Sequence, residues 1–237
     1  MRVNLGGIVP LSTVDWPGRA AMVVFLRGCP LRCPFCQNSS LQQGENFVEF
    51  SYIANKIKRI VNPDLGMDQL TLTDAVNLVM AKPLLSALVV SGGEPLMQPE
   101  PVKMIANLAK GLGLDMGIET SGYYPDRLSA LLRMNLLDKV FLDIKAPLKE
   151  PEYEIATGKK DVSNRVLESL RVCMKKGVHL TVRNTIFDEM SFPSGGLEIT
   201  RTLSELNAEF PNNCLEVKVL QKGIKRIKGS DQLEGND

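Results

Sequence analysis

Three cysteines stand close together in one short segment, RGCPLRCPFCQN at residues 27–38. Three residues separate Cys29 from Cys33, and two separate Cys33 from Cys36. Thiolates at such short spacing are typical ligands of zinc or of iron–sulfur clusters, which normally take four protein ligands. The spacing therefore predicts a metal centre in this segment, with a fourth ligand still to be found.

The rest of the chain offers few candidates for that ligand, because it contains five cysteines and one histidine in all. Cys173 falls within an expected helix, on or beside its apolar face, which is typical of a buried structural cysteine. Cys214 and His179 each stand at the start of an expected strand, at the rim opposite the cysteine segment. We therefore expect the fourth position to be empty of protein, as a metal site needs in order to bind a substrate.

Polar residues also follow three of the expected strands. The segments are SGGEP at 91–95, ETSG at 119–122 and DIK at 143–145. In α/β sheets and barrels the carboxyl ends of the strands meet at one rim, which carries the working residues. We expect these segments and the cysteine segment to surround one site. Gly92 and Gly93 would let the backbone approach a ligand there, because neither has a Cβ atom.

Short apolar segments alternate with amphipathic ones along the chain. We predict strands at residues 21–27, 87–93, 115–120, 139–145, 179–187 and 215–221. Their nearly continuous apolar runs are typical of a parallel sheet covered on both faces. Apolar residues at helical spacing predict helices at 49–61, near 71–82, at 102–112, 128–132 and 163–176. This alternation predicts an α/β fold, either an open doubly wound sheet or a barrel.

The chain of 237 residues shows no internal repeat and no linker rich in proline or serine. We expect a single domain over residues 1–237, with a cluster loop at 28–38 and a flexible polar tail from about residue 222. The interval between the first two strands is irregular and carries the cysteine segment.

The charge balance and the lack of long apolar runs argue against a nucleic-acid-binding protein and a membrane protein. The 28 Lys and Arg residues nearly balance 27 Asp and Glu residues, so the net charge is +1 and no basic excess indicates a nucleic-acid partner. The basic run KGIKRIKG near the C-terminus is interpreted as a solvated tail. No apolar run suggests a signal peptide or a membrane span, so we expect a cytoplasmic protein. A reducing compartment disfavours disulfides and favours metal or redox chemistry for clustered cysteines.

The segment CPLRCPFC matches Cys-x3-Cys-x-aromatic-Cys and resembles the signature of the radical S-adenosylmethionine enzymes, with Phe35 as the aromatic residue. The resemblance implies an incomplete (β/α)6 TIM-like barrel and a [4Fe–4S] cluster on the three cysteines. The fourth iron would be chelated by S-adenosylmethionine, which accounts for the missing ligand. SGGEP resembles the Gly-Gly-Glu element of the family, so Gly92, Gly93 and Glu94 would contact the methionine amino group.

The resemblance is narrower still, to activating enzymes of glycyl-radical enzymes. STVDWPGR at 12–19 is similar to the Thr-Val-Asp-x-Pro-Gly opening of those that serve anaerobic ribonucleotide reductase and pyruvate formate-lyase. ETSGY resembles their Asp-Thr-x-Gly segment, and FLDIK resembles their Leu-Asp-Leu-Lys segment. By that pattern Asp143 and Lys145 would bind the cosubstrate, and the lysine would reach its carboxylate.

The same pattern places Glu119 and Thr120 in the cosubstrate pocket, together with a monovalent cation. Glu119 departs from the pattern, because the activating enzymes usually have Asp there and an extra methylene shifts the carboxylate. Gln221 also departs from it, at a place where pyruvate formate-lyase activating enzymes stack a histidine on adenine. Arg183 matches an arginine of the family, and a surface or salt-bridged arginine is the alternative.

The implied function is that of an activating enzyme. It would cleave S-adenosylmethionine to a 5′-deoxyadenosyl radical, without catalytic residues beyond the cluster and cosubstrate. The radical would take a hydrogen atom from a glycine of a partner enzyme. The first candidate for this partner is anaerobic ribonucleotide reductase. A flavodoxin or ferredoxin would supply the electron. The alternatives are a radical enzyme for a small molecule, such as a deazaguanine synthase, and a non-catalytic iron–sulfur or zinc protein.

Overall fold

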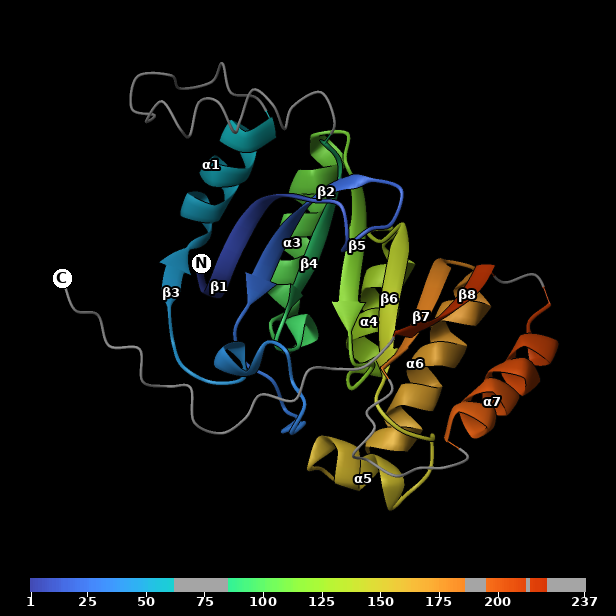
Figure 1. The fold of residues 1–237 in the computed structure, drawn as a ribbon. Coiled ribbons are helices and arrows are strands. Elements are labelled where there is room, and N and C mark those ends of the chain that lie inside the picture. The colour runs from blue at the N-terminus through green and yellow to red at the C-terminus, as the bar shows by residue number, and fades with distance from the viewer. Residues whose placement is uncertain (62–84, 186–194, 212–213, 221–237) are drawn as a thin grey trace.

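The structure is a computed structural model, and it describes residues 1–61, 85–185, 195–211 and 214–220. Its strands form one eight-stranded sheet in the order β3-β1-β2-β4-β5-β6-β7-β8 (Figure 1). The strands are β1 (Arg2–Ser12), β2 (Ala20–Leu26), β3 (Phe47–Glu49), β4 (Leu85–Gly92), β5 (Asp115–Thr120), β6 (Lys139–Ile144), β7 (His179–Thr185) and β8 (Cys214–Leu220). From β2 to β8 every neighbouring pair is parallel, which is the strand arrangement of the expected incomplete (β/α)6 barrel.

The helices follow the strands in alternation. They are α1 (Phe50–Val61), α3 (Pro99–Gly111), α4 (Pro125–Arg133), α5 (Glu152–Thr157), α6 (Val162–Lys176) and α7 (Gly195–Glu209). Figure 1 shows α3, α4 and α6 on one side of the sheet, behind the strands. The helix expected near 71–82, the tail from 222 and Gln221 lie outside the described residues. Within the described residues no helix is long and apolar enough to cross a membrane.

All six predicted strands are present, but β1 and β3 were not predicted. The β1 sequence RVNLGGIVPLS contains two adjacent glycines and a proline, which are turn signals that mask a strand. Its antiparallel pairing with β2 has irregular register, and β3 covers only its first residues, Arg2 to Asn4. Such irregularity near a sheet edge is where glycine and proline are tolerated.

The two faces of the sheet have different neighbours, because side chains alternate along each strand. On β6, Val140, Leu142 and Ile144 belong to the large core beneath the helices. Phe141, between them, belongs to a small inner cluster with Trp16 and the side chains of β2 and β4. The inner face thus has a compact apolar base, and the polar residues of the strand ends lie beyond it.

Candidate active site

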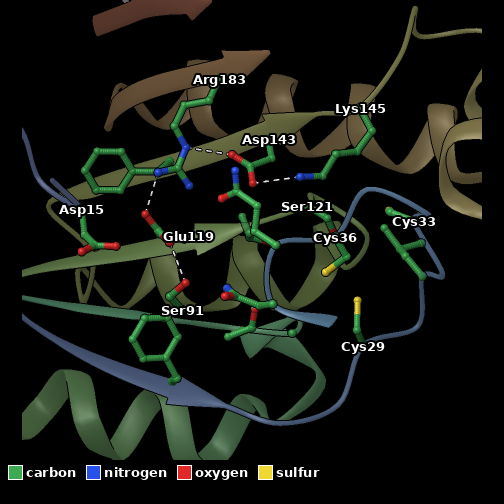
Figure 2. Close-up of a pocket in the computed structure, with 18 of the residues that line it drawn as sticks. Asp15, Cys29, Cys33, Cys36, Ser91, Glu119, Ser121, Asp143, Lys145 and Arg183 are labelled. Carbon is green, nitrogen blue, oxygen red and sulfur yellow. Dashed lines mark hydrogen bonds and ion pairs between the residues drawn. The ribbon is translucent and has the colours of Figure 1, made fainter. Parts of the chain in front are cut away.

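The four polar segments converge on one cavity of about 470 Å³ at the carboxyl ends of the strands. The predicted residues that line it are Cys29, Cys33, Phe35, Cys36, Gly92, Gly93, Glu119, Thr120, Asp143, Lys145 and Arg183. Figure 2 shows the cysteine loop at one side of this cavity and Asp15 at the other, with charged side chains between them. The structure therefore brings the segments together at one rim, as the strand pattern predicts.

The three clustered cysteines share one loop after β2. Each is partly buried, and no disulfide joins the four cysteines whose side chains the structure describes. Burial raises the pKa of Cys29 to about 12, and it also raises the pKa of Cys33 although the Lys145 ammonium opposes that shift. Thiols in such surroundings keep their protons until a metal replaces them. In the described part of the chain, no three His, Cys, Asp or Glu side chains are close enough to hold a single metal ion.

Two glycines bring the cysteine loop and the SGGEP loop into backbone contact. The Gly93 amide donates to the Leu26 carbonyl at 2.9 Å, and the Glu94 amide donates to the Gly28 carbonyl at 2.8 Å. A Cβ atom would lie 2.0 Å from the Leu26 oxygen at Gly92 and 2.3 Å from the Gly28 oxygen at Gly93. These glycines thus permit a close approach to the neighbouring loop, and because both also line the cavity, their approach to a ligand stays a prediction.

The Glu94 side chain is not among the residues that line the cavity, and its expected contact with the methionine amino group stays a prediction. Glu94 is fully buried, and its oxygens accept hydrogen bonds from the Leu96 amide at 3.0 Å and the Ser121 amide at 2.8 Å. The hydroxyls of Thr120 and Ser121 also donate to it, at 2.9 and 2.6 Å. Burial raises the pKa of Glu94 despite these bonds. Glu94 therefore ties the loop after β4 to the loop after β5.

A chain of charged side chains crosses the cavity (Figure 2). The Ser91 hydroxyl donates to Glu119 at 2.6 Å, and the Arg183 guanidinium donates to Glu119 at 2.6 Å and to Asp143 at 2.8 Å. The Lys145 ammonium completes the chain with a bond to Asp143 at 3.0 Å. Two carboxylates and two cations alternate along it, so its charges balance.

Burial and neighbouring charges act in opposite directions on the pKa values of Asp143, Lys145 and Glu119. Burial by itself would raise the pKa of Asp143, but Lys145 and Arg183 together hold it below its usual value. Asp143 in turn raises the pKa of Lys145 against the opposing effect of burial. Burial raises the pKa of Glu119, and the Arg183 guanidinium only partly offsets this. At neutral pH Lys145 is therefore a charged ammonium held beside the cysteine loop.

Arg183 is salt-bridged, as the alternative predicts, and it also lines the cavity, so its role in cosubstrate binding stays a prediction. Its guanidinium carbon lies 5.4 Å from the centre of the Phe141 ring. Phe141 and Thr181 line the cavity but were not predicted as site residues, and Ser91 lines it from within the SGGEP segment. Strand alternation could have found the first two, since Phe141 is two residues before Asp143 and Thr181 is two residues before Arg183.

The residues near Glu119 do not fit a monovalent cation. Both Glu119 oxygens already accept hydrogen bonds, from Ser91 and Arg183, and the Asp143 oxygens are shared between Arg183 and Lys145. A cation would have to displace a guanidinium that is bonded to both carboxylates. Arg183 therefore supplies the positive charge at the place where the family resemblance implied an ion.

Comparison with known proteins identifies the family of the chain. Residues 23–191 match the family model of the radical SAM superfamily. A protein of Methanocaldococcus jannaschii, named as a glycyl-radical enzyme activating enzyme, is 28% identical over 86% of this chain and 77% of its own length. The pyruvate formate-lyase-activating enzyme of Clostridium pasteurianum is 31% identical over 66% of this chain and 58% of its own length.

Other relatives have different named activities. A 7-carboxy-7-deazaguanine synthase of Methanocaldococcus jannaschii is 28% identical over 58% of this chain and 54% of its own length. The solved structure of TYW1 with a lysine-pyruvate adduct bound superposes with a TM-score of 0.58 at 15% identity, covering 88% of this chain and 66% of that one. That likeness concerns the fold alone. Because the family match spans more than half of the sequence, including the cysteine motif, the chain belongs to the radical SAM superfamily of enzymes.

Proposed function

We propose that this chain holds a [4Fe–4S] cluster and S-adenosylmethionine in the rim cavity and installs a glycyl radical on a partner enzyme. The superfamily implies both groups. The observation that carries the proposal is the convergence of three thiols and the Asp143–Lys145 pair on one cavity. Relatives named as activating enzymes and the STVDWPGR motif support a glycyl-radical partner, with anaerobic ribonucleotide reductase as the first candidate.

The donor set fits the cluster. Cys29, Cys33 and Cys36 provide three thiols at one side of the cavity, which leaves one iron of a four-iron cluster for the cosubstrate. When bound, the cluster supplies one electron that cleaves S-adenosylmethionine to methionine and a 5′-deoxyadenosyl radical, which removes a hydrogen atom from the target glycine. The protein contributes position and electrostatics to this chemistry.

Lys145 fits the carboxylate of the cosubstrate. An ammonium group has three donors, and one bond of Lys145, to Asp143, is described. Asp143 holds the ammonium in place, and Arg183 holds Asp143 in turn. Lys145 would thus present a fixed positive charge beside Cys33 and Cys36, where the methionine part of the cosubstrate would bind.

The other side of the cavity is suited to the partner. Val14, Asp15 and Pro17 line the cavity. Figure 2 shows Asp15 away from the cysteines. In our proposal a loop of the glycyl-radical enzyme enters from this side and brings its glycine to the centre of the cavity. In our proposal the chain works in the cytoplasm, and a flavodoxin or ferredoxin there supplies the electron.

A small-molecule substrate is the second candidate, because one relative is named a 7-carboxy-7-deazaguanine synthase. Such a substrate would need side chains that recognise a polar heterocycle. The cavity side chains not engaged in the charged chain include Asn38, Gln42 and Thr181. This candidate predicts turnover of a deazapurine precursor without any protein partner.

The test uses anaerobically reconstituted protein with S-adenosylmethionine and a reductant. We expect methionine and 5′-deoxyadenosine, and a glycyl-radical signal by electron paramagnetic resonance after addition of anaerobic ribonucleotide reductase. Replacement of Cys29, Cys33 or Cys36 with Ala should abolish iron and sulfide binding, whereas Cys173→Ala should retain it because that thiol is buried in the helix-facing core. Cys214→Ala, at the start of β8, should retain it too.

Each outcome separates the candidates. Absence of cosubstrate cleavage in a fully loaded protein would contradict an enzymatic role. Cleavage without a radical on any glycyl-radical enzyme, together with turnover of a deazapurine precursor, would favour the second candidate. Loss of the cluster in Cys173→Ala would contradict the three-cysteine assignment.

A further inference from the structure

A group of basic side chains lies on the outer side of the cysteine loop. They come from the loop itself, from α4, from the segment after α5 and from α6, and we name them the cationic patch: Arg32, Arg127, Lys159, Lys160 and Arg165. Three of them are exposed, and Arg127 and Lys159 are half-buried. None of the five lines the cavity described above.

Two tyrosines hold part of the patch together. The Tyr123 ring has the Lys159 ammonium 4.9 Å and the Arg165 guanidinium carbon 4.8 Å from its centre. The Tyr124 ring meets Tyr123 edge to face at 4.8 Å and carries the Arg127 guanidinium at 4.1 Å. Cation–π contacts of this kind fix three positive charges around one aromatic pair.

The patch is joined directly to the loop that carries the cysteines. The Arg32 amide donates to the Thr157 carbonyl at 2.7 Å, and its guanidinium donates to the Cys29 carbonyl at 2.6 Å. The Gly158 backbone packs on Arg32, since a Cβ atom there would lie 3.2 Å from the Arg32 Cβ. Lys159 and Lys160 follow immediately, so their charges stand beside the cysteine loop.

These charges are not neutralised by ion pairs among the described residues. Elsewhere, Lys110, Lys139 and Lys149 each have an acidic partner within 4 Å, whereas no such ion pair involves a patch residue in the described ranges. Asp126 and Asp161 are the acidic residues next to the patch in sequence, and both are exposed. The whole chain has a net charge of +1, so this positive excess is local.

We infer that the cationic patch is the docking surface for an acidic one-electron carrier protein of the flavodoxin or ferredoxin class; this rests on the proposed function. A protein substrate must enter the cavity, but the patch lies outside it. An electron donor only has to bring its reduced group close to the cluster ligands, which the outer side of the cysteine loop allows. The carrier is oxidised by one electron and the cluster is reduced by one, with no atom transferred. Opposite charges on the two proteins would steer this encounter.

The test compares two triple charge reversals in the reconstituted enzyme. The patch variant carries Lys159→Glu, Lys160→Glu and Arg165→Glu. The control carries Lys56→Glu, Lys58→Glu and Arg59→Glu, which make the same change in net charge on an exposed face of α1. Stopped-flow absorbance follows cluster reduction by reduced flavodoxin and, separately, by photoreduced 5-deazariboflavin, a small neutral donor.

We expect the bimolecular rate with flavodoxin to fall at least about tenfold in the patch variant and less than about twofold in the control. The wild-type rate should also fall as ionic strength rises, because salt screens exposed charges. Reduction by 5-deazariboflavin should be equal in all three proteins. An unchanged flavodoxin rate in the patch variant would overturn the inference.

Other outcomes identify other roles. Normal reduction by flavodoxin with loss of radical transfer to the glycyl-radical enzyme would assign the patch to that enzyme and overturn the inference. Salt-sensitive binding of a transfer RNA that disappears in the patch variant would overturn it in favour of a nucleic acid. If wild-type protein reduced by 5-deazariboflavin fails to cleave S-adenosylmethionine, the proposed function fails, whatever the flavodoxin rates are.

Discussion

At the scale of single residues, the site depends on four charged side chains whose charges cancel in pairs. Arg183 bonds to Glu119 and Asp143 together, and Lys145 takes the second oxygen of Asp143. Buried charges persist when each has a partner and hydrogen bonds. The Lys145 ammonium, at the end of this chain, is the member nearest the cysteine loop in Figure 2. The contribution of Lys145 to S-adenosylmethionine binding can be measured separately from its contribution to the stability of the fold.

Replacing Lys145 with Met tests that separation, because methionine keeps the length and apolar stem of the side chain. We expect the affinity of the reconstituted protein for S-adenosylmethionine to fall by about ten- to hundredfold, since a hydrogen bond to a charged group contributes about 1.5–3 kcal/mol. Isothermal titration measures this affinity, and thermal melting of the cluster-free protein measures stability. Arg183 remains to neutralise Asp143, so the loss of stability should be moderate.

Lys139→Met is the matched control. Lys139 is at the other end of β6, paired with Glu216 at 3.4 Å, and it lies far from the cysteine loop along the strand. This variant should melt earlier than wild type yet bind the cosubstrate normally. A large drop in the melting temperature of Lys145→Met with unchanged affinity would mean that Lys145 only stabilises the barrel.

At the scale of elements, the cysteine loop and the SGGEP loop form one unit. Gly93 and Glu94 donate their amides to the backbone of the residues that lead into the cysteine loop. The loop after β5 joins them through Ser121 and Thr120, which bond to Glu94. A change in one loop must therefore move the others. A substitution at Gly93 should then affect the cluster as well as the cosubstrate.

Gly93→Val should disturb both groups. Its Cβ would lie 2.3 Å from the Gly28 oxygen, a backbone atom that cannot move aside without moving the cysteine loop. We expect iron content after reconstitution to fall to less than about half of the wild-type value, because a β-branched residue adds bulk beyond the Cβ atom. Cosubstrate affinity should fall with it.

Gly7→Val provides the comparison, since a Cβ at Gly7 meets nothing within 4 Å and the residue lies in strand β1. This variant should load iron normally. Full iron content in Gly93→Val would show that the two loops move independently.

At the scale of the whole molecule, the inner face of the incomplete barrel must be covered by apolar side chains. Trp16 does this from the segment between β1 and β2, where it is 6% exposed. Its ring meets Phe141 edge to face at 5.7 Å, and a Cβ at Gly117 would come within 3.0 Å of it. Trp16 thus packs across β5 and β6 beneath the cavity. This gives Trp16, within the STVDWPGR motif, a structural role.

Trp16→Ala should lower the free energy of unfolding by about 3–5 kcal/mol, because it removes a large buried side chain from the inner cluster. Urea unfolding followed by far-ultraviolet circular dichroism measures it, since the chain has one tryptophan and the variant loses that fluorophore. Trp16→Phe should cost less than half as much. A loss below about 1 kcal/mol in Trp16→Ala would mean that the inner cluster contributes little to stability.

The sequence by itself determined the strand alternation, the superfamily and the segments that meet at the rim. Apolar periodicity is a local property, and CPLRCPFC is a contiguous motif, so neither needs long-range information. The order of parallel strands then brings DIK, ETSG and SGGEP to the same rim as the cysteines. β1 escaped prediction because its glycines and proline are turn signals whose effect depends on a neighbouring strand.

Only the tertiary structure decided which side chains point into the site and which support it. Glu94 and Thr120 both come from rim motifs, yet Thr120 lines the cavity whereas the Glu94 carboxylate is enclosed and accepts a hydrogen bond from Thr120. Arg183 takes the place expected for a cation because β7 pairs with β6 in the register that sets it opposite Asp143. The cationic patch joins residues from four segments. Such contacts depend on distances between segments far apart in the chain, and no local pattern of residue types encodes those distances.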